Sequence, residues 1–368
     1  MTTNIKRPVI RYNNISLLKG GSPAFDVNSN SGDGVNFLSY INNLNFNFSV
    51  PENKEQVISS KSSLNHFFKP GVEVKLQLQK NEDFDDLFLE YFTPTGLVED
   101  LNKDFNLYGI IADQVGRDSI HANLSGFDMI SFGNCHLDSF SMSQTTNGLV
   151  NSDYSFTAYN MKAERVSGKD GDNFSFSGEA PSINLAGDQT NIINSFPLGY
   201  SFTGLNNKFQ RSLTGSSVFP SYNTSISISG LNNVETFLIE TDSIQGFDFK
   251  ADVGSKEIYT IGKKYPIKRK ALFPTEGSFS FTNKVSTFRV NRNEDYEDFS
   301  AERDLKKYLD NQAFYKITLQ MTNITGKSVT LELPSGRLES QSYSAAIGSD
   351  VECNLDFSFD LFAMNNSI

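Results

Sequence analysis

Two short acidic segments are the densest groups of side chains in this sequence that could do chemistry. The first, from Lys80 to Asp86, reads Lys-Asn-Glu-Asp-Phe-Asp-Asp, and the second, from Arg292 to Asp298, reads Arg-Asn-Glu-Asp-Tyr-Glu-Asp. Every position matches by chemical type, and the segments on both sides match in the same order. The candidate site residues are Glu82, Asp83, Asp85, Asp86, Glu294, Asp295, Glu297 and Asp298.

Carboxylates at this density can ligate Ca²⁺ through oxygen, and a carboxylate pair held across a cleft can cleave a glycosidic bond. The calcium loop Asp-x-Asp-x-Asp-Gly is absent, however, and no glycine supplies its turn. Duplication of the acids also argues against a single catalytic cleft. The sequence favours a solvated acidic loop that follows a strand, and we expect no metal, no cofactor and no catalytic residue.

The remaining reactive side chains form no recognisable constellation. There is no Gly-x-x-x-x-Gly-Lys loop, no His-Glu-x-x-His motif and no Gly-x-Ser-x-Gly elbow. Cys135 and His136 are adjacent, so a strand sends them to opposite faces, which disfavours a shared metal site. We expect Cys135 in the core, His136 on the surface, and a protein that is not an enzyme.

Composition narrows the class of protein. A chain of 368 residues suits two domains of moderate size. The formal net charge of −11 argues against a protein that grips nucleic acid, because such surfaces are basic. Two cysteines make no disulfide framework, and we see neither a signal peptide nor an apolar run long enough for a membrane anchor.

Alternating apolar and polar residues predict strands in the first half of the chain. Leu44, Phe46, Phe48 and Val50 alternate with Asn and Ser, so we interpret the phenylalanines as core. A short helix is expected over 99–103, and a turn at Asn147-Gly148 joins a hairpin. The expected strands cover 9–18, 44–50, 72–78, 107–111, 137–142 and 154–158.

The second half repeats this order. Strands are expected over 247–253, at Phe279 and Phe281, over 314–317 and over 355–361, with a helix over 301–311. The segment that begins at Phe314 aligns with the one that begins at Leu107. A weaker match aligns Tyr12 to Leu17 with 222–227. We conclude that one domain is written twice.

The expected architecture is mainly β, with two tandem homologous antiparallel β-sandwich or barrel domains, each with one short α-helix. Residues 1–40 form an N-terminal arm with a strand and a long loop. The first repeat covers 41–180, a linker covers 181–200, and the second repeat covers 201–368. Strands and helices do not alternate along the chain, so we do not expect a doubly wound fold.

This layout resembles the tail-tube-like virion structural proteins of tailed bacteriophages, in a form with two tandem tube-type domains. The segments that carry the resemblance are Ser255 to Gly262 with Tyr265-Pro266, and Phe132-Gly133-Asn134 with Tyr159-Asn160. The similarity extends from about residue 36 to the end. It is a pattern of strands and turns without an invariant catalytic motif.

The resemblance implies six-fold rings in which strands of neighbouring subunits form an inner β-barrel, with loops and arms joining successive rings. Three chains would make one pseudo-hexameric ring, or six a hexamer, and the rings would stack into a tube. The other expected partners are tail proteins such as the sheath, hub and terminator. DNA would slide through an acidic lumen without specific binding. The expected location is the virion tail, assembled in the host cytoplasm.

The resemblance leaves the position of the acidic motifs open, at the lumen or between subunits. It also leaves alternatives within the tail: a trimeric baseplate hub or tube-initiator ring instead of the tube itself. A pair of carbohydrate-binding β-sandwich modules at a tail tip is the alternative from another class. A glycoside-cleaving enzyme that uses the acidic clusters is the third.

Overall fold

The structure is a computed structural model that describes residues 12–20, 36–38, 40–49, 52–55, 65–68, 73–84, 86–90, 92–93, 105–113, 127–169, 173–175, 217–230, 244–259, 261, 266, 268–271, 276–285, 314–344 and 351–361. The expected helices over 99–103 and 301–311 and the linker over 181–200 lie outside these residues, as does the long loop of the N-terminal arm.

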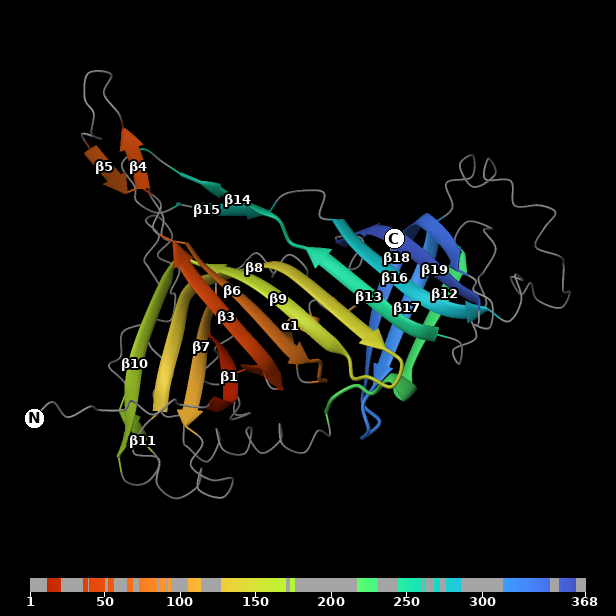
Figure 1. The fold of residues 1–368 in the computed structure, drawn as a ribbon, viewed down its shortest axis with the longest axis horizontal. Helices are drawn as coiled ribbons and strands as arrows, with labels where there is room; N and C mark the ends of the chain where they lie inside the picture. The colour runs from red at the N-terminus through yellow and green to blue at the C-terminus, as the bar shows by residue number, and fades with distance from the viewer. Residues whose placement is uncertain are drawn as a thin grey trace, which may run out of the picture.

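The described residues are mainly antiparallel strands, which confirms the expected fold class (Figure 1). The elements before residue 200 are β1 (Tyr12–Gly20), β2 (Asn36–Leu38), β3 (Ile41–Ser49), β4 (Glu52–Glu55), β5 (Asn65–Phe68), β6 (Glu73–Asn81), α1 (Leu87–Glu90), β7 (Phe105–Asp113), β8 (Phe127–Thr145), β9 (Asn151–Ala158), β10 (Asn160–Lys169) and β11 (Asn173–Ser175).

The elements after residue 200 continue the same kind of structure. They are η2 (Ser221–Asn223), β12 (Thr224–Gly230), β13 (Ile244–Asp252), β14 (Ser255–Ile258), β15 (Lys268–Ala271), β16 (Glu276–Val285), β17 (Phe314–Thr322), β18 (Ser328–Ser344) and β19 (Val351–Asp360).

Strand pairing follows one order in both halves. In the first half β3 pairs with β6, β6 with β9, β9 with β8, β8 with β7, and β7 with β1. In the second half β13 pairs with β16, β16 with β19, β19 with β18, β18 with β17, and β17 with β12. A two-stranded hairpin follows the first strand of each series, β4–β5 after β3 and β14–β15 after β13.

Irregularities in the register recur at equivalent places, which aligns the halves residue by residue. A β-bulge adds one residue to one strand of a pair and is fixed by the fold. The matching register shifts lie at Ile41/Asn43 and Ile244/Gly246, at Phe105/Leu107 and Tyr315/Ile317, and at Leu137/Ser139 and Leu338/Ser340.

This alignment corrects two details of the sequence comparison. Leu107 is equivalent to Ile317 and not to Phe314, because each follows the same register shift. Leu17 is equivalent to Ile226, one residue away from the sequence alignment, because Leu17 opposes Gly109 and Ile226 opposes Leu319. A slip of one residue matters in a strand, since it moves every side chain to the other face.

Within the described residues the halves are joined into one sheet of fifteen strands, which is not closed on itself. The joining strand is β8, which is nineteen residues long. Its first part pairs with β7 and β10, and its last part pairs with β9 and β13. Strand β8 therefore belongs to both layers of the first half, and it also pairs with β13, the strand that begins the pairing series of the second half.

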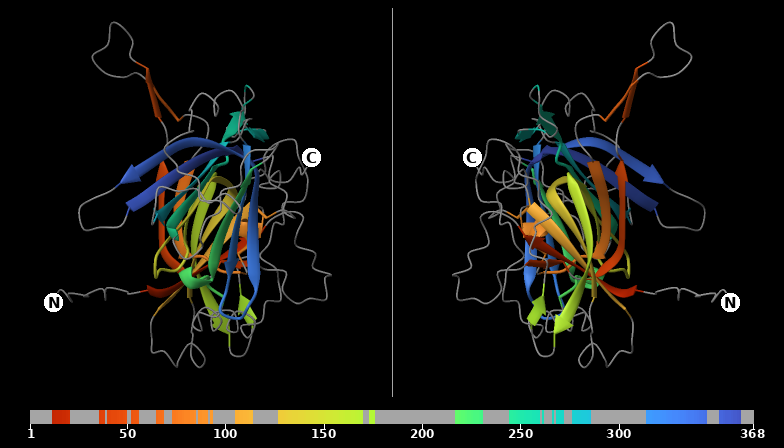
Figure 2. Two further views of the ribbon diagram at one scale, coloured as in Figure 1. Left: turned by 90° about the vertical axis from the view of Figure 1, so that its right-hand side faces the viewer. Right: turned by 90° about the vertical axis from the view of Figure 1, so that its left-hand side faces the viewer.

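The core lies between two layers of strands. Phe46 of β3 contacts Phe132 in the first part of β8, with ring centroids 5.5 Å apart, so the sheet folds back over its own inner face. Phe88 of α1 packs between the layers against Phe105 and Phe156. Figure 2 shows the body end-on, with the β4–β5 hairpin standing clear of it.

Complementary side-chain sizes fill equivalent positions of the two cores. Val74 opposes Ala158 in the first half, and Gly277 opposes Phe359 at the equivalent pair in the second. A Cβ atom on Gly277 would lie 2.3 Å from Cζ of Phe359, so only glycine leaves room for this ring. A small residue facing a large one keeps both cores close-packed.

The expected strands are found, and the predicted turn is present, with Asn147 at a φ of 63° between the paired strands β8 and β9. The interpretation of alternating phenylalanines as core holds in β13 and β16 but is wrong in part of β3. Phe46 is 39% exposed and Phe48 is 62% exposed. The reason is that β3 lies at an edge, as described below.

Candidate functional site

The first acidic motif lies where three segments of the chain meet. The N–H of Glu82 donates to the carbonyl oxygen of Val150 at 2.7 Å, and Asp83 forms an antiparallel bridge with Val218. The N–H of Phe84 donates to the carbonyl oxygen of Ser217 at 3.1 Å. The motif therefore connects β6 both to the β8–β9 turn and to the segment that leads into β12.

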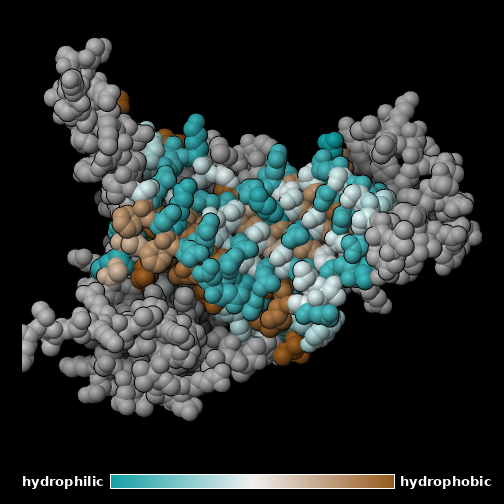
Figure 3. Space-filling view, in the orientation of Figure 1, coloured by the Kyte–Doolittle hydropathy of each residue, from teal (hydrophilic) through white to brown (hydrophobic). Residues whose placement is uncertain are grey.

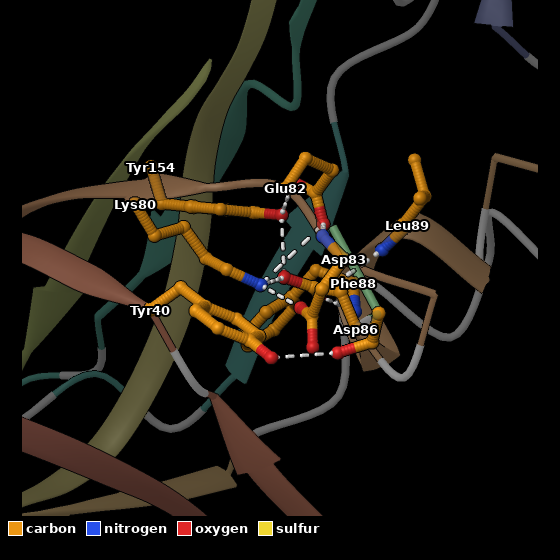
Figure 4. A network of polar contacts seen from close by, with 9 residues as sticks. Tyr40, Lys80, Glu82, Asp83, Asp86, Phe88, Leu89 and Tyr154 are labelled. Atoms are coloured by element: carbon orange, nitrogen blue, oxygen red, sulfur yellow. Dashed lines mark hydrogen bonds and ion pairs between the residues drawn. The ribbon is translucent and has the colours of Figure 1, made fainter. Parts of the chain in front are cut away.

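A lysine ammonium group occupies the centre of the motif (Figure 4). The Nζ atom of Lys80 lies 2.6 Å from Oδ1 of Asp83 and 3.4 Å from Oε1 of Glu82, and it also donates to Oδ2 of Asp86. All four side chains are buried. A buried charge is tolerated only when it is paired and hydrogen-bonded, which this geometry provides.

Tyr154 of β9 completes the cluster. Its hydroxyl oxygen lies 3.0 Å from Oε2 of Glu82 and 3.0 Å from Oδ2 of Asp86. A phenol has a single hydrogen to donate, so the second short contact requires a proton on one carboxyl group. Oδ1 of Asp86 accepts from the N–H of Phe88 at 2.7 Å, which ties the cluster to the start of α1.

The electrostatics place that proton on Glu82. Burial raises the pKa of Glu82 to about 8, and the nearby carboxyl of Asp86 acts in the same direction. Burial alone would raise the pKa of Asp86, but the ammonium of Lys80 lowers it below its ordinary value. Burial would lower the pKa of Lys80, yet Asp83, Asp86 and Glu82 together raise it well above its ordinary value.

The three carboxyl groups alone have the proximity of a metal site, with one ligand atom from each of Glu82, Asp83 and Asp86 within 4.8 Å of one another. The ammonium of Lys80 already provides the cation, and the cluster is closed to solvent. The residues therefore do not fit a Ca²⁺ site, which also needs six or more oxygen ligands. The chemistry of this cluster is structural: it holds the motif against the entry to the second half.

The expectation of a solvated acidic loop is wrong for the three described acids, Glu82, Asp83 and Asp86. All three are buried within the single chain. Asp85 and all four acids of the second motif, Glu294, Asp295, Glu297 and Asp298, lie outside the described residues.

The structural alignment does not place the two motifs at equivalent strand positions. Lys80 of β6 opposes Ser152, and the equivalent residue of β16 is Asn283, which opposes Cys353. Arg292, the sequence counterpart of Lys80, comes after the end of β16. The first half thus has a buried lysine where the second half has an asparagine.

Of the adjacent residues Cys135 and His136, only the histidine differs from expectation. Cys135 is buried, as predicted, but His136 is buried as well, so the surface assignment is wrong. The ring of His136 packs edge-on against Tyr159, with centroids 5.8 Å apart. The hydroxyl of Tyr159 in turn donates to Oε1 of Glu257 in β14 at 2.5 Å, so this hairpin lies close to the buried end of the sheet.

A second feature, which the sequence alone did not reveal, is the junction between the halves. Residues Gly246 to Asp252 of β13 pair with Thr145 to Ser139 of β8. Phe249 lies opposite Met142 and is buried against Phe92 and Phe140. The junction is therefore both a hydrogen-bonded sheet and a part of the core.

The strands equivalent to those of the junction, β3 and the last part of β18, each have one side that pairs with no described strand. Strand β3, equivalent to β13, pairs with β6 but with no other described strand. The last part of β18, equivalent to the last part of β8, pairs with β19 on one side, while β17 ends its pairing at Arg337. Open edges carry unpaired backbone groups that can pair with another chain.

One face of the sheet, called the bare face below, is acidic and largely exposed, except near the buried His136 and Thr157. Side chains at opposed positions of neighbouring strands share a face. The exposed acids of this face are Asp153, Asp248, Asp252, Glu276, Glu339, Asp356 and Asp360, and its exposed bases are Lys75, Lys250 and Arg337. Figure 3 shows this face as largely hydrophilic, with apolar surface where β3 ends. The opposite face carries α1 and the second layer.

In the described part of the chain, no helix has the length and apolar character needed to cross a membrane. The sequence matches no protein-family model and no curated protein sequence.

Proposed function

We propose that this protein is a ring-forming structural subunit and that its ring is a segment of a bacteriophage tail tube. The observation that carries the proposal is the β8–β13 junction together with the two open edges that are equivalent to it. The junction demonstrates that strands of this kind join two units side by side. A second copy offers the same pair of strands.

Repetition of this contact leads to a ring. The contact is heterologous, because β3 of one copy would meet β18 of the next, and a heterologous contact forms a ring if its rotation closes. Closure removes both open edges. Three chains would supply six similar units, which agrees with the six-fold rings that the sequence resemblance implies.

The bare acidic face supports a role around DNA. In a closed ring, the bulk of α1 and the second layer would lie outside, and the bare face would line the bore. Its excess of carboxylates would repel phosphate groups, because nucleic-acid affinity depends on neutralising them with lysine and arginine. DNA could then pass without binding, as a conduit requires.

The two hairpins support stacking of rings. The β4–β5 and β14–β15 hairpins project toward the same side of the molecule (Figure 1). The second carries exposed apolar side chains at Ile258 and Tyr259. Such projections suit contact with a ring above or below, which favours a repeating tube over a single hub or initiator ring.

The proposal is tested by electron microscopy and mass measurement of the purified full chain over a wide concentration range. We expect rings or tubes with a six-fold outline and a mass of three chains per ring. A bore of uniform width should appear on the axis. A chain that stays monomeric at every concentration would contradict the proposal, as would a ring whose bore is lined by basic residues.

A further inference from the structure

Three of the large exposed apolar side chains are found on the two open edges. Phe46 and Phe48 lie on β3, and Tyr343, which is 39% exposed, lies on the last part of β18. At the equivalent positions of the closed junction, Phe249, Ala251 and Met142 are each exposed by 1% or less. The difference in burial follows from the presence or absence of a neighbouring strand.

The closed junction fixes the register of the open one. In the junction Phe249 opposes Met142, Ala251 opposes Phe140, and Asp252 opposes Ser139. Because the register shifts are shared, Phe46, Phe48 and Ser49 of β3 are equivalent to Phe249, Ala251 and Asp252 of β13. In the same way, Tyr343, Gln341 and Ser340 of β18 are equivalent to Met142, Phe140 and Ser139 of β8.

We infer that β3 of one copy pairs antiparallel with the last part of β18 of a second copy, with Phe46 opposite Tyr343 and Phe48 opposite Gln341. This inference rests on the proposed ring and names its contact surface. In the same register Asn45 opposes Ser344, Asn47 opposes Ser342, and Ser49 opposes Ser340. The partner is a second copy of this chain.

The composition of β3 favours pairing with a strand of another chain, because it lacks the features that protect edge strands from such pairing. Edge strands that must stay unpaired are short or carry charges or proline. Strand β3 has nine residues, Ile-Asn-Asn-Leu-Asn-Phe-Asn-Phe-Ser, with neither a charge nor a proline. Its apolar side chains point to the same face as those of β6, whose Val74 and Leu76 are buried. A neighbouring β18 would therefore extend the core.

Steric fit limits the paired segment at one end. In the junction, Gly246 approaches β8 so closely that a Cβ atom would lie 2.6 Å from the carbonyl oxygen of Gln144. Asn43 is the equivalent residue of β3 and carries a side chain. The pairing between chains should therefore extend from Asn45 to Ser49 and should not include Asn43.

Paired cysteines test the register directly. The Asn47→Cys/Ser342→Cys double variant places two thiols on opposed residues of neighbouring chains, within the 4.4–6.8 Å Cα separation that a disulfide needs. The matched control is the out-of-register variant Asn47→Cys/Ser344→Cys. All three positions are exposed, and the native Cys135 and Cys353 are buried.

We expect oxidation of the in-register variant to give covalent oligomers up to the full ring on non-reducing gels. The out-of-register variant should give at least tenfold less, and each single-cysteine variant none, because β3 does not meet β3. Rings that form without in-register cross-links, or that favour the out-of-register pair, would overturn this inference and leave the proposed function standing. Absence of both rings and cross-links would overturn both.

A charge on the edge provides a second measurement. Phe48→Asp should weaken ring assembly at least tenfold in sedimentation while the monomer keeps its unfolding midpoint, because Phe48 is largely exposed in the single chain. The control is Tyr222→Asp, which changes an exposed aromatic residue that lies on neither edge. Equal assembly of both variants and the wild type would overturn the inference.

Discussion

Phe249 and Phe46 occupy equivalent positions of the two halves, yet Phe249 is 1% exposed and Phe46 is 39% exposed. Phe249 is covered by Phe92 and Phe140, which the β8–β13 junction brings against it. Phe46 has Phe132 on its inner side and no described strand beyond β3. The same residue type thus fills a core in one half and faces solvent in the other.

The difference predicts unequal costs of truncation. Phe249→Ala should lower the free energy of unfolding by about 3–5 kcal/mol, because it leaves a cavity at the junction. Phe46→Ala should cost less than half as much in the monomer, since much of its ring is already in water. Urea unfolding at concentrations that keep the chain monomeric measures both. Equal losses would contradict the assignment of β3 as an open edge.

Removal of the buried cation should be strongly destabilising. Lys80→Met leaves the carboxyl groups of Asp83 and Asp86 buried without their partner, and breaking a buried ion pair in this way costs about 3–5 kcal/mol. Lys75→Met, on the solvent side of the same strand, is the matched control and should change stability by about 0.5 kcal/mol or less. Chemical denaturation distinguishes the two, and similar values would refute the central role of Lys80.

The proton on Glu82 predicts a pH dependence of stability. The pKa of Glu82 rises from 4.5 to about 8 on folding, so the folded chain binds one more proton than the unfolded chain between these values. Stability from this group is complete below pH 4.5 and is lost as pH rises toward 8, by up to about 1.4 kcal/mol per pH unit.

Glu82→Gln removes this dependence while keeping a neutral side chain of the same shape. Unfolding midpoints of the wild type and the variant, measured from pH 5 to pH 8, should diverge in slope, with the wild type falling more steeply. Contributions from titrating groups that do not interact with Glu82 cancel in the difference. Parallel curves would show that Glu82 is ionised in the folded chain.

The size exchange between the two cores predicts a compensating pair of substitutions. Gly277→Ala should cost about 1–3 kcal/mol, because its Cβ atom meets the Phe359 ring. Ser278→Ala, the adjacent exposed residue, should have little effect. The double variant Gly277→Val/Phe359→Ala recreates the pair formed by Val74 and Ala158. It should lose less stability than the sum of its single variants in a double-mutant cycle.

The sequence by itself determined the strands and their repetition. Alternation of apolar and polar residues is a local property, so β6, β13 and β19 could be predicted without a fold, and so could the hairpin turn at Asn147. The repeat of the acidic motif was visible for the same reason, although the sequence did not show that Asn283 of β16, and not Arg292, is the structural counterpart of Lys80.

Only the tertiary structure decided which apolar side chains are buried and what the acids do. A period of two shows that Phe46 and Phe249 each face one side of a strand, but not whether another strand covers that side. Likewise, the acids after β6 look solvated in the sequence because Tyr154, which bonds them, is 68 residues from Asp86. Burial and pairing depend on contacts between distant segments, and only the sheet brings those segments together.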